Sequence, residues 1–244
     1  MIVNYTADGW QIIYQQAHAL LAAQLAWHWQ PFGPTDRWVG TLAAITQHDD
    51  EQQQWDGHYG LTPAGAPANF TMQEFSLEQA NSLMQAARFQ GRWRSLLTSL
   101  HMSTLYESLR GQNQETDTFL DEQQACQKRW LKELELPKKD ATQAYDLMHW
   151  CDRLSLILCR QELPEMSRAL EIYTGSDGQR YDVVRPAEDG PLTVRPWPFR
   201  EKQLTVSVEV SILRQLQFKD DAELAAALRQ APIETLTWHL KSRI

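Results

Sequence analysis

The chain has 244 residues, 43% of them hydrophobic, and a formal net charge of −8. This length is enough to bury a substantial core, and we expect residues 1–244 to form a single compact unit. The acidic balance argues against non-specific binding to nucleic acid or to anionic membranes, because both depend on basic patches that neutralise phosphates. We therefore expect a small-molecule substrate as the partner, with no nucleic acid and no membrane. The sequence leaves the oligomeric state open and is compatible with a homo-oligomer.

The longest apolar stretch, residues 17–29, is interrupted by polar side chains, so we do not expect it to cross a bilayer. The start of the chain lacks the basic flank of a signal peptide, and we expect a cytoplasmic protein. Three cysteines without a CxxC pair argue against a disulfide framework and against a thiolate zinc site. We expect Cys126, Cys151 and Cys159 to be reduced thiols in the core.

The first 14 residues predict a β-hairpin, because Asp8-Gly9 tolerates the positive φ of a tight turn between two β-rich runs. Apolar residues then recur at helical spacing over residues 15–29. Thr35 or Asp36 can cap the next helix, which runs as far as residue 47.

A loop over residues 56–70 is long enough to form a lid or a pocket wall. The segment from Ser76 to Gln79 has the spacing of a capping box and indicates the start of another helix. Helices are also predicted over residues 93–111, 117–136 and 140–161, the last two being stopped by Pro137 and Pro164.

The character of the chain changes after residue 167, where β-branched runs alternate with glycine turns. These runs predict strands over residues 170–173, 181–184, 204–210 and 233–240, with a short helix over residues 220–230. The expected fold class is α+β, mainly α, with a helical body of residues 15–165. Residues 1–14 and 168–244 form a β-rich appendage, in which we expect the hairpin and the C-terminal strands to share one antiparallel sheet.

Four groups of histidine and aspartate lie on, or at the ends of, separate predicted helices: His18, His48-Asp49, His101 and Asp152. Imidazole nitrogen and carboxylate oxygen together suit divalent Fe, Mn, Zn, Co or Ni, whereas an all-oxygen set favours Mg or Ca. The pattern therefore predicts a site for one or two transition-metal ions.

Each of these residues also has a simpler explanation. A lone histidine on an apolar face, such as His18, is more often a core residue bonded to a backbone carbonyl. His48 can cap the end of its helix, and Asp49 can begin a solvated acidic run. An unpaired imidazole at His101 and an unpaired carboxylate at Asp152 are costly in a core. One metal site accounts for all five residues together, because it neutralises the carboxylates and accepts the imidazole lone pairs.

The order His, His-Asp, His, Asp on separate helices resembles that of the HD-domain superfamily of metal-dependent phosphohydrolases. The resemblance covers residues 18–152 and includes the adjacent His48-Asp49 pair. It implies an HD-like helical body in which these residues hold metal, and His101 makes the chain more similar to members with two metals.

A second resemblance covers nearly the whole chain and implies no activity. The chain is similar to an uncharacterised bacterial family, the domain of unknown function DUF3891. The segments that carry the resemblance are Met1-Ile-Val, the hairpin into Trp10, Gln16-Ala-His18-Ala, His48-Asp49-Asp50, Trp55-Asp56, the run from Ser99 through His101 to Leu105, and Pro196-Trp-Pro-Phe199.

From these features we expect a metal-dependent hydrolase of a small phosphorylated or similar substrate, with metal-activated water as the nucleophile. The alternatives are a di-iron HD-type oxygenase with the same ligands and a non-catalytic helical binding module with structural metal or none. The catalytic candidates are Asp49, Asp56 and His149. Asp56 would orient water or substrate, although a cap at the start of the loop explains it equally well. His149 lies three residues before Asp152 and would be a further ligand or proton donor, or simply a partly exposed histidine.

Overall fold

The computed structural model describes residues 1–50, 60–72, 76–165, 167–187 and 190–243. The helices are α1 (Gln15–His28), α2 (Thr35–Thr46), α3 (Leu77–Arg88), α4 (Arg92–Tyr106), α5 (Gln114–Glu133), α6 (Lys138–Cys159) and α7 (Asp221–Gln230). The strands are β1 (Ile2–Thr6), β2 (Gly9–Ile13), β3 (Ala169–Thr174), β4 (Arg180–Val184), β5 (Thr193–Arg195), β6 (Gln203–Leu213) and β7 (Ile233–Lys241). This arrangement confirms the α+β, mainly α, fold class.

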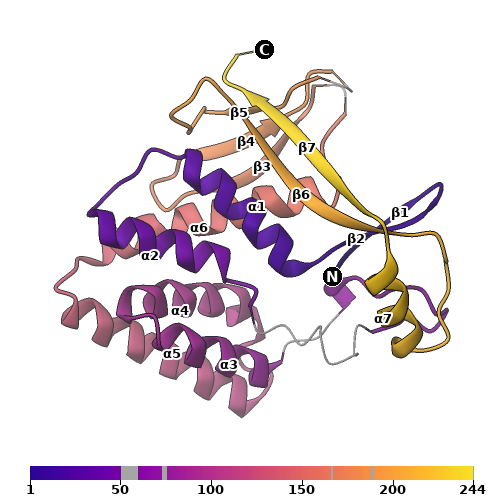
Figure 1. The fold of residues 1–244 in the computed structure, drawn as a ribbon. Helices are drawn as coiled ribbons and strands as arrows, with labels where there is room; N and C mark the ends of the chain where they lie inside the picture. Colours follow the sequence, from indigo (N-terminus) through magenta and orange to yellow (C-terminus); the bar gives the residue numbers. More distant parts are fainter. Residues whose placement is uncertain (51–59, 73–75, 166, 188–189, 244) are drawn as a thin grey trace.

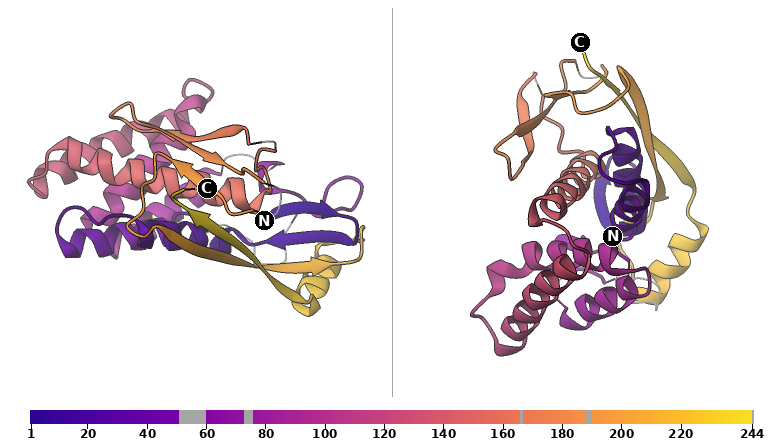
Figure 2. Two further views of the ribbon diagram at one scale, coloured as in Figure 1. Left: turned by 90° about the horizontal axis from the view of Figure 1, so that it is seen from above. Right: turned by 90° about the vertical axis from the view of Figure 1, so that its left-hand side faces the viewer.

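Helices α1 and α6 lie side by side in the middle of the molecule, between the strands and the layer formed by α3, α4 and α5 (Figures 1 and 2). Helix α6 also contacts α2 and α4. Three consecutive residues of α6, Trp150, Cys151 and Asp152, are all buried. A helix that is buried on more than one face is covered by neighbours on several sides, and α6 packs against α1, α2, α4 and β3.

The predicted antiparallel sheet of the hairpin and C-terminal strands is confirmed, and the remaining strands form a second sheet. The hairpin joins β6 and β7 as predicted, in a sheet with the order β1-β2-β6-β7, while β3, β4 and β5 make a separate sheet. A strand has only two hydrogen-bonding edges, and both edges of β6 are used, by β2 and by β7. Among the described residues, a bridge between Leu192 and Leu240 connects the two sheets.

Several predicted helix boundaries need correction. Helix α3 begins as predicted, with the Ser76 hydroxyl accepting a hydrogen bond from the amide of Gln79. Helix α5 begins earlier than residue 117, because the Asn113 side chain caps it by accepting from the amide of Thr116. Helix α4 ends at Tyr106, and a single 3-10 turn continues the predicted segment over Glu107–Leu109.

One large buried cluster includes side chains from the hairpin, from the helices and from the C-terminal strands, for example Ile2, Leu21, Met148 and Val206. Cys151 and Cys159 are buried as predicted, whereas Cys126 is only half-buried on α5. Every helix among the described residues is too short or too polar to span a bilayer.

Candidate metal centre

His18 is fully buried on α1, with both ring nitrogens in contact with polar groups. Its Nδ1 atom lies 2.9 Å from the Ser155 hydroxyl, and its Nε2 atom lies 2.5 Å from Oδ2 of Asp49. The Ser155 hydroxyl donates its one hydrogen to the backbone carbonyl of Asp152 at 2.8 Å, so it accepts from Nδ1 of His18. Nδ1 of His18 therefore carries a hydrogen. Nε2, which faces Asp49, carries either a second proton or a lone pair that a cation can accept.

His48 and Asp49 lie in the turn that follows α2. Nδ1 of His48 donates to the carbonyl of Ile45 at 2.6 Å, one of the last-turn carbonyls that lack a helical partner. Its Nε2 atom is left facing Oδ1 of Asp152 at 3.1 Å and Oδ2 of Asp49 at 3.6 Å. The helix-cap role and the ligand role use different ring nitrogens, so His48 can serve both.

His101 is buried on α4, and Asp152 is buried on α6. The His101 ring lies edge-on to the His48 ring, with centroids 5.3 Å apart and planes inclined by 89°. The buried Nδ1 atom of His101 has no hydrogen-bonding partner among the described residues. An unsatisfied buried polar atom costs free energy, which makes His101 unusual as a purely structural residue.

The five residues form two overlapping groups that share His48: His18-His48-Asp49 and His48-His101-Asp152. In each group, one donor atom from every residue lies within 4.8 Å of the others. Histidine and carboxylate ligands bind transition metals at about 2.0 to 2.2 Å, so donors around one ion stand a few ångströms apart. With two anchored imidazoles and one orphaned imidazole nitrogen, this donor set fits a divalent transition metal.

The electrostatics of the metal-free site favour positive charge. Burial opposes a charge on His48, but the carboxylates of Asp49 and Asp152 outweigh it and raise the pKa of His48 to about 10. Burial likewise opposes ionisation of Asp49 and Asp152, yet the charge of His48 holds the pKa of each carboxyl below its usual value. Burial, followed by the charge of His48, lowers the pKa of His101 to about 4. In the metal-free protein a proton on His48 supplies the positive charge between the carboxylates.

All five donors lie in the part of the chain that a known family covers. The family described as a protein of unknown function, DUF3891, matches residues 1–215. The chain belongs to DUF3891. Searches among curated proteins and among solved structures gave no match.

One of the predicted catalytic residues of this DUF3891 chain, His149, lies apart from the donors. His149 is half-buried on α6, with its ring 4.6 Å from that of Tyr173 and 5.8 Å from that of Tyr145. Burial lowers its pKa, and it belongs to neither donor group of the described residues. Tyr145 lies between His149 and His101, whose ring is 6.2 Å away. Asp56 lies outside the described residues.

The DUF3891 site also includes two residues that the sequence analysis missed. Ser155 fixes the tautomer of His18, and Gln15 donates to Oδ2 of Asp49 at 3.4 Å. Ser155 follows Asp152 by three residues, and Gln15 precedes His18 by three. Helical residues three apart share a face, so a search at this spacing around each predicted donor would have found both.

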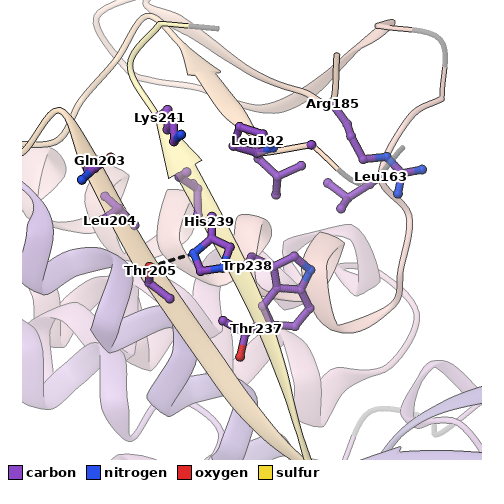
Figure 3. Close-up of a pocket in the computed structure, with 13 residues that line it drawn as sticks. Leu163, Arg185, Leu192, Gln203, Leu204, Thr205, Thr237, Trp238, His239 and Lys241 are labelled. Carbon is purple, nitrogen blue, oxygen red and sulfur yellow. Dashed lines mark hydrogen bonds between the residues drawn. The ribbon is translucent and has the colours of Figure 1, made fainter. Parts of the chain in front are cut away.

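A wide cavity of about 720 Å³ opens elsewhere in the DUF3891 chain, where β6 and β7 approach the bridge at Leu192 (Figure 3). Thr205 and His239, paired neighbours on β6 and β7 that both line the cavity, are joined by a hydrogen bond of 2.9 Å. None of the five donors lines this cavity. Cavity size and donor chemistry therefore point to different places. We assign the chemistry to the donors because, in the part of the chain that the structure describes, they combine burial with convergent ligand atoms.

Proposed function

We propose that the protein is a metal-dependent hydrolase of a small phosphorylated or similar substrate. The observation that carries the proposal is the pair of His/Asp groups that share His48. Two of the imidazoles also donate Nδ1–H to a protein oxygen, Ser155 for His18 and Ile45 for His48. Metal-binding histidines are usually anchored in this way, because the bond fixes the ring and directs the other nitrogen to the ion.

The exposure of the donors supports a catalytic site rather than a structural one. The side chains of His18 and His48 are 0% and 1% exposed, that of Asp152 is 11% exposed, and that of Asp49 is 17% exposed. Water and substrate would reach the site from the Asp49 side. Structural sites are closed by protein ligands, whereas catalytic sites keep an open position.

The residues would divide the chemistry as follows. A bound divalent ion lowers the pKa of water and offsets the charge that develops on phosphoryl oxygens. One or two ions would be held by the two donor groups that share His48, and the burial of the three histidines would exclude bulk water from that side. Asp49, the more exposed of the two carboxylates of the site, faces both the donors and the solvent, which suits it to orient a water and accept its proton.

A di-iron oxygenase is the second candidate, because two groups that overlap at one residue suit a pair of ions as well as a single one. The donor types do not separate the two activities, since imidazole and carboxylate serve iron in both. A non-catalytic module with structural metal is the third candidate, and the exposure of Asp49 weighs against it.

The test uses metal-free protein reconstituted separately with Fe, Mn, Co, Ni and Zn. Release of p-nitrophenol from phosphate mono- and diesters, or of inorganic phosphate from a panel of metabolites, would be measured for wild type, Asp49→Asn and Asp8→Asn. The proposal expects activity in wild type and in Asp8→Asn, an exposed carboxylate in the hairpin turn, and loss of activity in Asp49→Asn. Oxygen consumption by the iron form without any hydrolysis would favour the oxygenase. Activity that persists in Asp49→Asn would contradict the assigned role.

A further inference from the structure

A small cavity of about 190 Å³ lies beside α6, on a different face of this helix from Asp152. Asp146 and Trp150 line the cavity and are four residues apart, whereas Asp152 follows Trp150 by two and points elsewhere. Aromatic rings form most of the wall, and we call them the aromatic cage: Trp29, Phe32, Trp150, Tyr173 and Tyr181.

The rings of the cage are inclined to one another rather than stacked. Trp29 and Trp150 have centroids 4.9 Å apart and planes at 67°, and Trp29 and Tyr181 are 5.9 Å apart at 54°. Trp150 and Tyr181 are 6.0 Å apart at 79°. These rings pack edge to face and Trp150 is buried, so the cavity is faced mainly by the half-buried rings of Trp29, Tyr173 and Tyr181. The faces of aromatic rings carry negative electrostatic potential.

Two carboxylates add negative charge to the same cavity. Asp146 and Asp177 both line it, and both approach Gly175: a methyl group on this glycine would lie 3.0 Å from Oδ1 of Asp177 and 3.8 Å from Oδ2 of Asp146. No lysine or arginine occurs among the described residues of the lining. The pKa of Tyr181 is raised by burial and then by the charge of Asp177. The cavity therefore presents ring faces and carboxylates without a cation of its own.

The hydrogen bonds of Asp146 limit the kind of cation that fits. Oδ1 accepts from the Tyr173 hydroxyl at 2.9 Å, and Oδ2 accepts from the amide of Ser176 at 3.1 Å and from its hydroxyl at 2.5 Å. Asp177 accepts from the amide of Gln179 at 2.8 Å. Because the protein already uses most of the lone pairs of Asp146, this carboxylate offers a ligand charge rather than new hydrogen bonds.

We propose that the aromatic cage binds a small quaternary ammonium group. Such a group has no N–H to satisfy, carries its charge on an apolar surface, and gains from ring faces on several sides. The cavity is smaller than the roughly 300 to 1,000 Å³ of pockets for drug-sized ligands, so it holds a head group rather than a large molecule. This site is independent of the metal centre.

Choline chloride is the probe, and 3,3-dimethylbutan-1-ol, which has nearly the same shape without the charge, is its matched control. Binding would be followed by isothermal calorimetry and by tryptophan fluorescence, with and without a chelator. We expect choline to bind at least about tenfold more tightly than the alcohol, and equally with and without chelator. Equal affinities for the two probes, or no choline binding up to about 10 mM, would overturn the proposal.

Two variants of the aromatic cage, each with a matched control variant, locate the binding within the molecule. Tyr181→Leu should weaken choline binding by about threefold to thirtyfold, while Tyr181→Phe keeps the ring and should stay within about twofold of wild type. Asp177→Asn should weaken binding, whereas Asp8→Asn removes the same charge from the hairpin turn and should not. Thermal melts establish that each variant is folded. Choline binding that is unchanged in both Tyr181→Leu and Asp177→Asn would place it outside the aromatic cage.

Discussion

The imidazole of His18 and the hydroxyl of Ser155 are joined by a buried hydrogen bond of 2.9 Å between α1 and α6. Because the hydroxyl donates its hydrogen to the carbonyl of Asp152, Nδ1 of His18 carries a hydrogen. This one contact determines which nitrogen faces Asp49, and so it decides whether the first donor group can accept a cation.

Ser155→Ala should therefore lower metal affinity by about tenfold to a hundredfold, the usual effect of losing the partner of a ligating histidine. The affinity would be measured by competition with a chelating dye. Ser211→Ala is the matched control, because Ser211 is also a buried serine but lies in β6. An affinity equal to that of wild type in Ser155→Ala would mean that this serine does not anchor a metal ligand.

Asp152→Asn should remove most of the bound metal, since the change keeps the size of the side chain but removes a charge from the second donor group. Elemental analysis of the purified variant is the readout, and Asp8→Asn is the control at an exposed position. Metal content that stays at the wild-type level would show that Asp152 is a structural partner of His48 and not a ligand.

His101→Leu should have opposite effects on stability and on metal binding. In the metal-free protein it removes a buried nitrogen without a partner, so the free energy of unfolding should rise by about 1 to 3 kcal/mol. The stabilisation that wild type gains on adding metal should shrink, because a ligand is lost. Chemical denaturation with and without metal measures both effects. A metal-free variant that is less stable than wild type would indicate that His101 makes a structural contact instead.

The metal-free protein should lose stability as the pH rises from about 6.5 to about 10. Burial acts against the charge of His48, but Asp49 and Asp152 raise its pKa from 6.5 to about 10. A group whose pKa is raised by folding stabilises the folded state fully below its unfolded pKa, and this contribution disappears as the pH passes the folded pKa. Urea unfolding in the presence of a chelator would follow the decline. His48→Asn should flatten it, and a decline of the same size in this variant would assign it to other groups.

Much of the site could be predicted because its polar residues occur at positions where the helical pattern calls for apolar ones. His18, His101 and Asp152 interrupt apolar helical faces, and the structure does bury all three close to His48. Periodicity shows which face a residue occupies, and a buried carboxylate needs a partner. What periodicity does not give is the contact between residues far apart in the chain, such as His18 and Ser155, which are 137 positions apart.

The pairing of the strands is also a contact between distant residues that the sequence pattern does not give. Alternation in the sequence identifies β3, β4 and β6, but a strand pattern does not name the neighbour with which it pairs. The hairpin turn at Gly9 is local and was predicted correctly. The division into two sheets depends on which edges of β4 and β6 are already occupied, and this is settled only by the packed structure.

The metal content of protein purified without chelator or nickel resin tests the central claim most directly. The two donor groups predict roughly one or two transition-metal ions per chain by elemental analysis. A chain that contains no metal, and that gives no calorimetric binding signal with Mn, Fe or Zn, would contradict the claim. His48 would then be a buried imidazolium held between Asp49 and Asp152 for structural reasons alone.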